Sequence, residues 1–250
     1  AGARRAASPR EAAAGAEVIV ICVSDTPDVE EVVLGAGGLI NGAGPGSVVV
    51  DCSTICPRRT RAIGEALAAQ GVGMLDAPVS GGSEGARLGT LSIMVGGRSE
   101  DLEKAGPILS AMGKTITHVG PLGSGQFTKA INQIICAGNY LAVAEGLVLG
   151  IKAGLDMDKV VEAVRGGAAA SWVLQNRSGN VLKNEYPLGF RVSLHRKDLG
   201  YALEAAKDLE VGLPLTALVA QMFNSLMALG RGDEDVSSLA RVIREQAGLK

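Results

Sequence analysis

Short apolar runs alternate with amphipathic segments in the first half of the chain. Residues 18–23 (Val-Ile-Val-Ile-Cys-Val) and 48–50 (Val-Val-Val) are continuous apolar runs of strand length, which is typical of strands that helices cover on both faces. Ser99 is expected to cap a later helix and Pro107 to interrupt it. Further strands are predicted at 74–76 and 91–95, and further helices at 28–34 and 57–70. Strands that alternate with helices predict parallel βαβ units in one open sheet.

The pattern changes completely after Gly125, where strand-like runs give way to helical periodicity. Apolar residues between Leu199 and Ala206 recur with the i, i+3, i+4, i+7 spacing of a buried helical face. Helices are predicted at 125–153, 156–166, 168–179, 194–211, 214–230 and 237–247. We therefore expect an α/β domain over residues 1–122 and an all-helical domain over residues 123–250, which a long helix enters.

Composition places the chain among globular proteins. It has 250 residues, of which 47% are apolar and 20% charged, enough to bury a substantial core. A net charge of −2 and an aromatic content of 3% argue against nucleic acid or a membrane surface as a partner. The most apolar stretch, 134–151, is interrupted by Asn139 and Glu145, so we expect a buried helix there and no membrane span.

The cysteines and histidines predict neither disulfides nor a metal site. The four cysteines lie in apolar segments without paired spacing, which predicts buried free thiols and a cytoplasmic location. His118 and His195 are the only histidines, and neither clusters with a cysteine, so no metal ligand set is expected.

Two glycine-rich segments carry the chemistry of the sequence. Residues 76–82 (Asp-Ala-Pro-Val-Ser-Gly-Gly) end a predicted strand in a hydroxyl and two glycines, which expose backbone N–H groups that can bind a small anion. Residues 120–125 lead into a helix that carries Lys129 and Asn132. A plain strand-to-loop turn and a solvated lysine are the structural alternatives. The combination favours an enzyme that acts on a carboxylate, and Pro78 at the first position of G-x-S-x-G excludes a serine hydrolase elbow.

No G-x-G-x-x-G occurs before the first predicted strand, although a domain of this type usually begins with a glycine-rich turn that binds phosphate. Two interpretations remain open. The sequence is an incomplete copy that lacks a leading βαβ unit of at least ~30 residues, or the domain does not bind a dinucleotide. We favour the first, because Ala1 is not a methionine and the remaining elements are in order.

Three motifs together resemble the β-hydroxyacid dehydrogenase (3-hydroxyisobutyrate dehydrogenase-like) family over essentially the whole chain from Ser8. Its substrate motif is matched by Asp76, Pro78, Val79, Ser80, Gly81, Gly82, Ala86 and Gly89. Its catalytic motif is matched by Gly120, Gly123, Gly125, Lys129 and Asn132, and its K-D-L motif by residues 197–199. The resemblance implies a Rossmann-like parallel-sheet domain followed by an all-α domain.

The resemblance also implies an oxidoreductase that uses NAD or NADP to interconvert a small 3-hydroxy acid and its semialdehyde. Ser80, Gly81 and Gly82 would hold the substrate carboxylate. Lys129 would supply the proton to the developing alkoxide. Asn132, three residues further along the same helical face, would orient the lysine or bind the substrate hydroxyl.

Coenzyme contacts are implied at two loops and in the second domain. Val23, Ser24 and Asp25 follow one predicted strand, and Ser53 and Thr54 follow the next, at the carboxyl ends where open α/β sheets bind ligands. By resemblance, Lys197 contacts the coenzyme from the helical domain. Asp198 is expected to cap or brace its helix.

Within the family, Gln133 together with residues 194–199 is more similar to the tartronate semialdehyde reductases, which form glycerate. Arg196 departs from the family's His-Ile-Lys. A 3-hydroxyisobutyrate dehydrogenase and a glyoxylate or succinic semialdehyde reductase remain alternatives. A non-catalytic interaction module and an imine reductase are disfavoured because Lys129 is present.

Gln133 is not expected to contact the substrate. The apolar helix at 214–230 is compatible with a homo-oligomer, and Trp172 is expected in the core or at a subunit interface.

Overall fold

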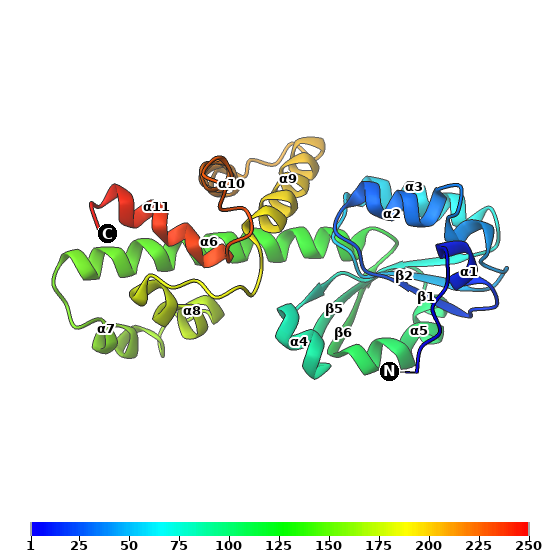
Figure 1. The fold of residues 1–250 in the computed structure, drawn as a ribbon, viewed down its shortest axis with the longest axis horizontal. Helices are drawn as coiled ribbons and strands as arrows, with labels where there is room; N and C mark the ends of the chain where they lie inside the picture. The colour runs from blue at the N-terminus through cyan, green and yellow to red at the C-terminus, as the bar shows by residue number, and fades with distance from the viewer. Residues whose placement is uncertain (1, 250) are drawn as a thin grey trace. The chain divides into compact units, whose positions relative to one another are not determined.

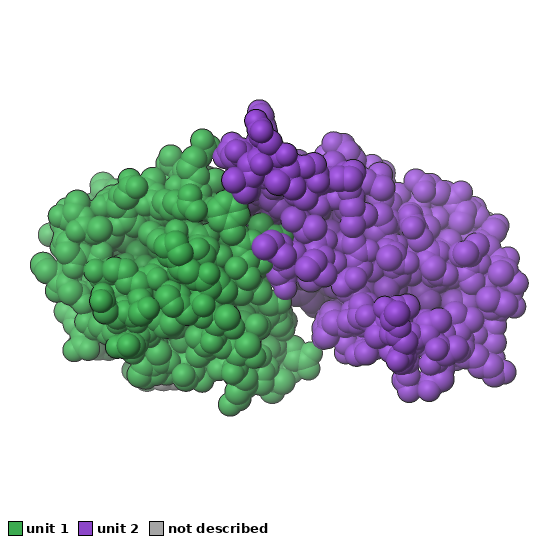
Figure 2. Space-filling view, turned by 180° about the vertical axis from the view of Figure 1, so that it is seen from behind, with its two compact units in different colours: residues 1–130 green, residues 131–250 purple. Residues whose placement is uncertain are grey.

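The structure, a computed structural model, describes residues 2–249 (Figure 1). It divides into two compact units, residues 1–130 and residues 131–250 (Figure 2). The division falls inside the helix α6 (Ser124–Lys152), which belongs partly to each unit. The predicted long helix at 125–153 is thus found, and the compact first unit extends past the boundary expected near residue 122.

A six-stranded sheet forms the middle of the first unit. Its strands are β1 (Val18–Ile21), β2 (Val48–Asp51), β3 (Gly73–Asp76), β4 (Val79–Ser80), β5 (Leu91–Gly96) and β6 (Gly113–Gly120). The order is β1-β2-β3-β5-β4, with β6 paired to β5. β1, β2 and β3 are parallel, as predicted. β5 runs antiparallel to both β3 and β4 and parallel to β6, so the sheet is mixed.

Two helical layers cover the two faces of this sheet (Figure 1). α2 (Thr26–Leu34) and α3 (Pro57–Ala68) pack on one face over Val49 and Met74. α5 (Ser99–Met112) packs on the other face over Val50. Successive residues of a strand point to opposite faces, which explains why the strands read as continuous apolar runs.

Several local predictions are wrong in detail. α5 begins at Ser99 itself, with Arg98 at the N-cap and no side-chain hydrogen bond there, and it continues through Pro107. An interior proline removes one backbone hydrogen bond and crowds the carbonyl four residues earlier, and α5 nevertheless continues to Met112. Of the four free cysteines, Cys22 is exposed and Cys136 is half-buried, so burial was predicted correctly for only two of them.

The second unit is helical, as predicted. After α6 it contains α7 (Met157–Val164), α8 (Trp172–Lys183), α9 (Val192–Asp208), α10 (Pro214–Ala228) and α11 (Leu239–Gln246). Its core joins Leu141 of α6 to Leu199, Phe223 and Leu239 of three later helices. Length and composition alone would allow α6 to cross a membrane, and 39% of its most apolar window is buried. Trp172 is 55% exposed and therefore does not lie in the core.

The start of α6 packs directly on the ends of the strands. A Cβ atom on Gly125 would lie 2.4 Å from the carbonyl oxygen of Met94 and 2.6 Å from that of Asp76. A Cβ atom on Gly96 would lie 2.4 Å from the Asp76 carboxylate. Both positions therefore need glycine for close approach of backbone to backbone.

We predict that Gly125→Ala lowers the free energy of unfolding by about 2 kcal/mol or more, because neither contacting carbonyl can move without disturbing a strand. Gly146→Ala is the matched control on the same helix, since a Cβ atom there meets nothing within 4 Å. It should be neutral or stabilising by up to ~1 kcal/mol. Chemical denaturation measures both values, and equal stability of the two variants would contradict the packing described.

Candidate functional site

The predicted substrate motif forms an exposed turn at the end of β4, which we call the glycine turn (Ser80–Gly82). Gly81 has a φ of +132° and Gly82 a φ of +63°, conformations that side chains other than glycine rarely adopt. Ser80 is half-buried and the two glycines are exposed. Bare backbone next to a hydroxyl is therefore presented to solvent, as the sequence predicted.

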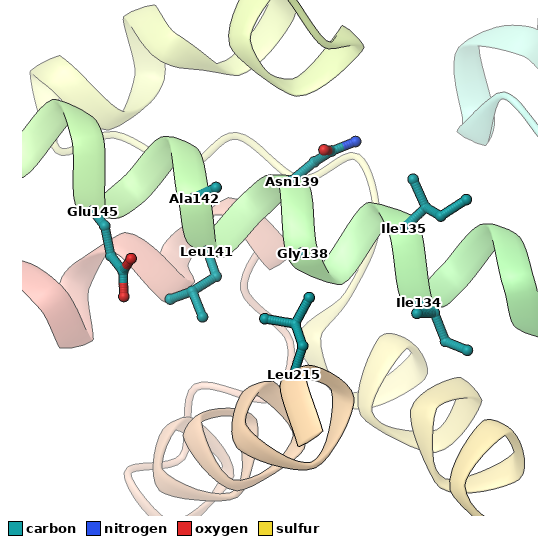
Figure 3. A pocket seen from close by; sticks show the side chains of 8 residues that line it. All are labelled: Ile134, Ile135, Gly138, Asn139, Leu141, Ala142, Glu145 and Leu215. Atoms are coloured by element: carbon teal, nitrogen blue, oxygen red, sulfur yellow. The ribbon is translucent and has the colours of Figure 1, made fainter. Parts of the chain in front are cut away.

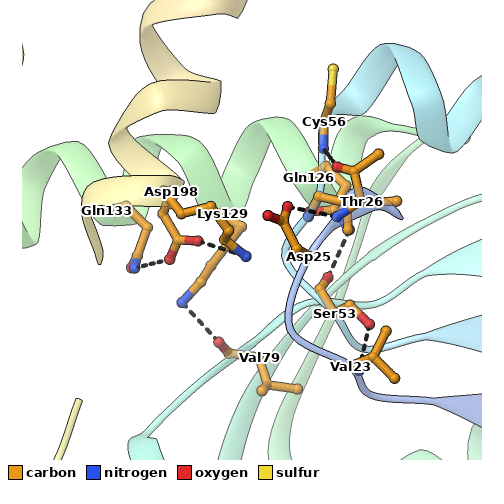
Figure 4. Close-up of polar contacts among 12 residues, drawn as sticks. Val23, Asp25, Thr26, Ser53, Cys56, Val79, Gln126, Lys129, Gln133 and Asp198 are labelled. Atoms are coloured by element: carbon orange, nitrogen blue, oxygen red, sulfur yellow. Dashed lines mark hydrogen bonds and ion pairs between the residues drawn. The ribbon is translucent and has the colours of Figure 1, made fainter. Parts of the chain in front are cut away.

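Lys129 lies against this turn. Its side chain comes from the second turn of α6 and is only 7% exposed. Its Nζ atom donates a hydrogen bond of 2.9 Å to the carbonyl oxygen of Val79 (Figure 4). Val79 directly precedes Ser80, so the structure brings the predicted proton donor and the predicted carboxylate-binding turn together. A buried ammonium group at such a position is unusual for a structural lysine.

Asp76 fixes the start of α6 to the strand that precedes the glycine turn. One carboxylate oxygen accepts a hydrogen bond of 2.8 Å from the N–H of Gly123, and the other accepts one of 2.7 Å from the N–H of Gln126. These N–H groups lie at a helix N-terminus, where no carbonyl of the helix can accept from them. A negative charge also interacts favourably with the helix dipole at this end.

Burial controls the titration of this carboxyl. Asp76 is fully buried, and burial raises its pKa to about 6, although the backbone hydrogen bonds from Gly123 and Gln126 act in the opposite direction. The sequence identified Asp76 only as part of a motif. Asp76 anchors the helix through two hydrogen bonds, to partners that lie 47 and 50 positions further along the sequence. No local sequence pattern reveals contacts over such separations.

The two predicted coenzyme loops meet at the carboxyl ends of β1 and β2. The N–H of Val23 donates a hydrogen bond of 2.9 Å to Oγ of Ser53 (Figure 4). Ser53 is 2% exposed, so its hydroxyl supports the neighbouring loop from inside the protein. Ser24 is exposed, and Asp25 and Thr54 are half-buried. Asp25 also caps α2 by accepting a hydrogen bond of 2.6 Å from the N–H of Thr26.

Gln126 links the second of these loops to α6, and the sequence analysis missed it. Its Oε1 accepts a hydrogen bond of 3.1 Å from the N–H of Ile55, and its Nε2 donates one of 2.8 Å to the carbonyl oxygen of Ser53 (Figure 4). The residue is 2% exposed. Only the burial of its polar side chain could have indicated this function, and burial is known from the structure.

The remaining predicted residues lie in the helical unit. Asn132 is half-buried, and its Nδ2 donates a hydrogen bond of 2.7 Å to Oε1 of Gln133. Lys197 on α9 has its Nζ 3.3 Å from Oδ1 of Asp198 and 5.6 Å from the ring centre of Tyr201. α9 begins at Val192, so Asp198 does not cap it. Asp198 is buried and braces α6 by accepting a hydrogen bond from Gln133.

These loops fit a nucleotide coenzyme. Because Val23 and Ser53 are bonded to each other, the two loops form one continuous surface at the edge where open α/β sheets bind ligands. Their outer positions, Ser24 and Thr54, leave polar groups at or near the surface. Within residues 2–249, no group of three or more histidine, cysteine or acidic side chains is placed to hold a metal ion.

Comparison with known proteins identifies the family. Residues 1–120 match the NAD-binding domain of 6-phosphogluconate dehydrogenase, and residues 123–243 match the NAD-binding domain of NADP-dependent 3-hydroxyisobutyrate dehydrogenase. The chain is 41% identical to the 2-hydroxy-3-oxopropionate reductase of Escherichia coli K12, over 100% of this chain and 85% of that protein. The chain belongs to the 3-hydroxyisobutyrate dehydrogenase-like family.

Solved structures with similar sequences have the same fold. The 3-hydroxyisobutyrate dehydrogenase of Mycobacterium tuberculosis with L-serine superposes with a TM-score of 0.86 at 30% identity, over 95% of this chain and 83% of that one. Psf3 in complex with NADP+ and 2-OPP superposes with a TM-score of 0.87 at 26% identity, over 95% and 84%. The chain is thus an NAD(P)-dependent hydroxy acid dehydrogenase by family, with a Rossmann-like domain followed by a helical domain.

The raised pKa of Asp76 predicts a specific dependence of stability on pH. Its carboxyl titrates at about 6 in the folded protein and near 3.8 otherwise, so between these values the folded state binds more protons than the unfolded state. The contribution of Asp76 to the free energy of unfolding is therefore fully present below about pH 4 and is lost as the pH rises through 6.

In Asp76→Asn this pH-dependent contribution should disappear. The free energy of unfolding of the variant should fall less steeply between pH 4 and 7, by up to about 1.4 kcal/mol per pH unit where the difference is one proton. Urea titrations at several pH values measure the slopes. Asp28→Asn removes an exposed carboxyl and controls for the change in net charge. Parallel profiles for the wild type and Asp76→Asn would show that this carboxyl does not titrate as described.

Proposed function

We propose that this protein reduces tartronate semialdehyde to glycerate, with NADH or NADPH as the reductant. The contact between the buried Lys129 ammonium and the carbonyl oxygen of Val79, 2.9 Å away, carries this proposal. It places a proton donor beside a turn that suits a carboxylate, which are the two groups needed for an aldehyde acid. The 2-hydroxy-3-oxopropionate reductase of E. coli, 41% identical over the whole chain, supports the choice of substrate.

The glycine turn would hold the substrate carboxylate. The hydroxyl of Ser80 and the N–H groups of Gly81 and Gly82 would donate to its oxygens, as backbone N–H groups in turns with positive φ do for small anions. Gly81 and Gly82 are exposed, so a small acid reaches them without displacing a side chain. No arginine is needed for this recognition.

Lys129 would supply the proton. A bound coenzyme would supply hydride for the aldehyde carbon, so that negative charge would develop on the aldehyde oxygen. Nζ of Lys129 stabilises that developing negative charge and transfers a proton to it, giving the hydroxyl of the product and a neutral amine. In the reverse direction the same nitrogen takes the proton from the hydroxy acid. Asn132, three residues along α6, would bind the substrate next to it.

The coenzyme would contact two loops of the first unit. We propose that Val23, Ser24 and Asp25 after β1, and Ser53 and Thr54 after β2, line its site in the first unit. Ser53 would line the site as a support for the loop, because its hydroxyl oxygen, its N–H and its carbonyl are bonded to Val23, Asp51 and Gln126. Lys197, whose side chain is 16% exposed, would contribute a positive charge from the helical unit.

Other small hydroxy acids and the corresponding aldehyde acids are the second candidate substrates. The M. tuberculosis relative of known structure contains L-serine, which carries an amino group where glycerate carries its 2-hydroxyl. Dehydrogenation of 3-hydroxyisobutyrate and reduction of glyoxylate or succinic semialdehyde need the same proton-transferring lysine and the same carboxylate-binding turn.

A cytoplasmic location of the protein stays a prediction.

The principal test is Lys129→Ala with tartronate semialdehyde and each coenzyme. We expect kcat to fall by about 10² to 10⁴, the range for the loss of a general acid, while the dissociation constant of the coenzyme is unchanged. Lys152→Ala, an exposed lysine at the end of the same helix, is the matched control and should keep the wild-type rate.

Two outcomes of this experiment would contradict the proposal. A Lys129→Ala enzyme with a near wild-type rate would remove the lysine from the mechanism. A wild-type kcat/KM that is higher for methylmalonate semialdehyde, glyoxylate or succinic semialdehyde than for tartronate semialdehyde would assign the protein to another substrate within the same chemistry.

We further propose that the chain forms a homo-oligomer through its helical unit. Ile131, Ile135 and Leu149 form a stripe along α6 and are each more than half exposed. Beside the stripe, a groove of about 430 Å³ lies between α6 and α10, with Leu215 on its far wall (Figure 3). Exposed apolar side chains beside a groove are a feature of many contacts between subunits.

The occupant that this proposal commits to is a second copy of the chain. Light scattering should therefore give at least twice the monomer mass. Ile135→Glu should lower that mass, because it places a charge in the middle of the apolar stripe. Arg165→Glu, an exposed charged residue on the loop that follows α7, should leave the mass unchanged. A monomeric wild type at micromolar concentration would contradict the proposal.

A further inference from the structure

Gln133 occupies the centre of a buried polar network within the helical unit. It is 3% exposed, and the sequence analysis did not place it among the residues that contact the substrate. Its Nε2 donates a hydrogen bond of 2.7 Å to Oδ2 of Asp198 (Figure 4), and its Oε1 accepts one of 2.7 Å from Nδ2 of Asn132. Both polar atoms of one side-chain amide are thus bound, one on each side.

The donor and acceptor properties of these groups determine the orientation of both amides. A carboxylate only accepts hydrogen bonds, and Nζ of Lys197 lies 3.3 Å from the other oxygen of Asp198. Gln133 must therefore turn its NH₂ group to Asp198 and its oxygen to Asn132. Asn132 in turn must direct its NH₂ group at Gln133. The oxygen of Asn132 is then the atom that points away from the network.

A second contact binds the backbone of Gln133 to α9, the helix that carries Asp198. Nε2 of His195 lies 3.1 Å from the carbonyl oxygen of Gln133, which makes this ring nitrogen the donor, because a carbonyl only accepts. His195 is 1% exposed and packs between Phe190 and Phe223. His195 and Asp198 are three residues apart on α9, so one face of that helix holds both the backbone and the side chain of Gln133.

We propose that Gln133 is a positioning residue that holds Asn132 as a hydrogen-bond acceptor for the 2-hydroxyl group of the substrate. The inference rests on the proposed function, in which the glycine turn binds the carboxylate and Lys129 binds the reacting oxygen. The 2-hydroxyl is then the one polar group of the substrate still without a partner. A fixed acceptor selects a hydroxyl at that carbon over a methyl group, which cannot donate.

The test compares two ligands that differ only at that carbon, glycerate and 3-hydroxyisobutyrate. Titration calorimetry of the protein with each acid gives the ratio of their dissociation constants, which does not depend on turnover. The wild type should prefer glycerate. Gln133→Leu frees the Asn132 amide to rotate, so the preference should fall about tenfold, the contribution of one hydrogen bond between neutral groups.

A double variant separates orientation from packing. In Gln133→Glu the new carboxylate accepts from Asn132 but faces the carboxylate of Asp198, so this variant should be unstable. Adding Asp198→Asn supplies an NH₂ group that can donate to the new carboxylate, and the oxygen of Asn132 again points away. The double variant should therefore recover the wild-type preference for glycerate. Gln221→Leu, an exposed glutamine on α10 that also accepts a hydrogen bond from an asparagine, should leave the preference unchanged.

Three results would overturn the inference. These are a wild type without preference for glycerate, a preference that survives in Gln133→Leu, and a double variant that folds without recovering the preference. If Gln133→Leu does not fold, the double variant decides alone. A different result would overturn the proposed function itself, namely a Lys129→Ala enzyme that keeps its activity. A Gln133→Leu enzyme that weakens binding of both acids equally would indicate a purely structural residue.

Discussion

The buried carboxylate of Asp76 is the interaction on which the arrangement of the first unit depends. It binds the N–H groups at the start of α6, which would otherwise be buried without acceptors at a cost of about 1 to 3 kcal/mol each. The backbone can approach so closely because Gly96 and Gly125 carry no side chain. The result is a helix whose first two turns are fixed to β3, and Lys129 lies in the second of those turns.

The anchored helix then explains how a flexible side chain can have a defined position. A lysine has four rotatable bonds, and its charged end is usually mobile and solvated. Here the backbone of Lys129 is fixed by the helix start, and its Nζ is held by the carbonyl oxygen of Val79. In the helical unit, Gln133 of α6 is also held in a defined position by hydrogen bonds. Asp198 on α9 binds its side chain, and His195 on the same helix binds its backbone carbonyl.

The sequence predicted those parts of the fold that depend on local pattern. β2 is a continuous apolar run because helices cover both of its faces, whereas Val20 of the equally apolar β1 is 42% exposed. The glycine turn was found because its φ values require glycine. β6 was missed because Lys114, Thr115 and Thr117 interrupt any apolar pattern. β4 has only two residues, too few for any periodicity.

The site was predictable to a similar degree. Lys129, Asn132 and the glycine turn were identified from motifs, and the structure places Lys129 against that turn. Gln126, Gln133 and the anchoring function of Asp76 could not be found in this way. Each depends on a partner between 47 and 73 positions away in the sequence, and helical periodicity contains no information about such partners.

Gln126 has one consequence for how ligands would influence each other. Its side chain binds the backbone of the loop after β2, and its own N–H binds Asp76. A displacement of that loop by a nucleotide therefore acts on the same helix start that positions Lys129. If occupancy at the loop changes the affinity of the glycine turn for an acid, then the acid must change the affinity of the loop for the nucleotide by the same factor. The contacts of Gln126 that would carry such a coupling all lie within the first unit.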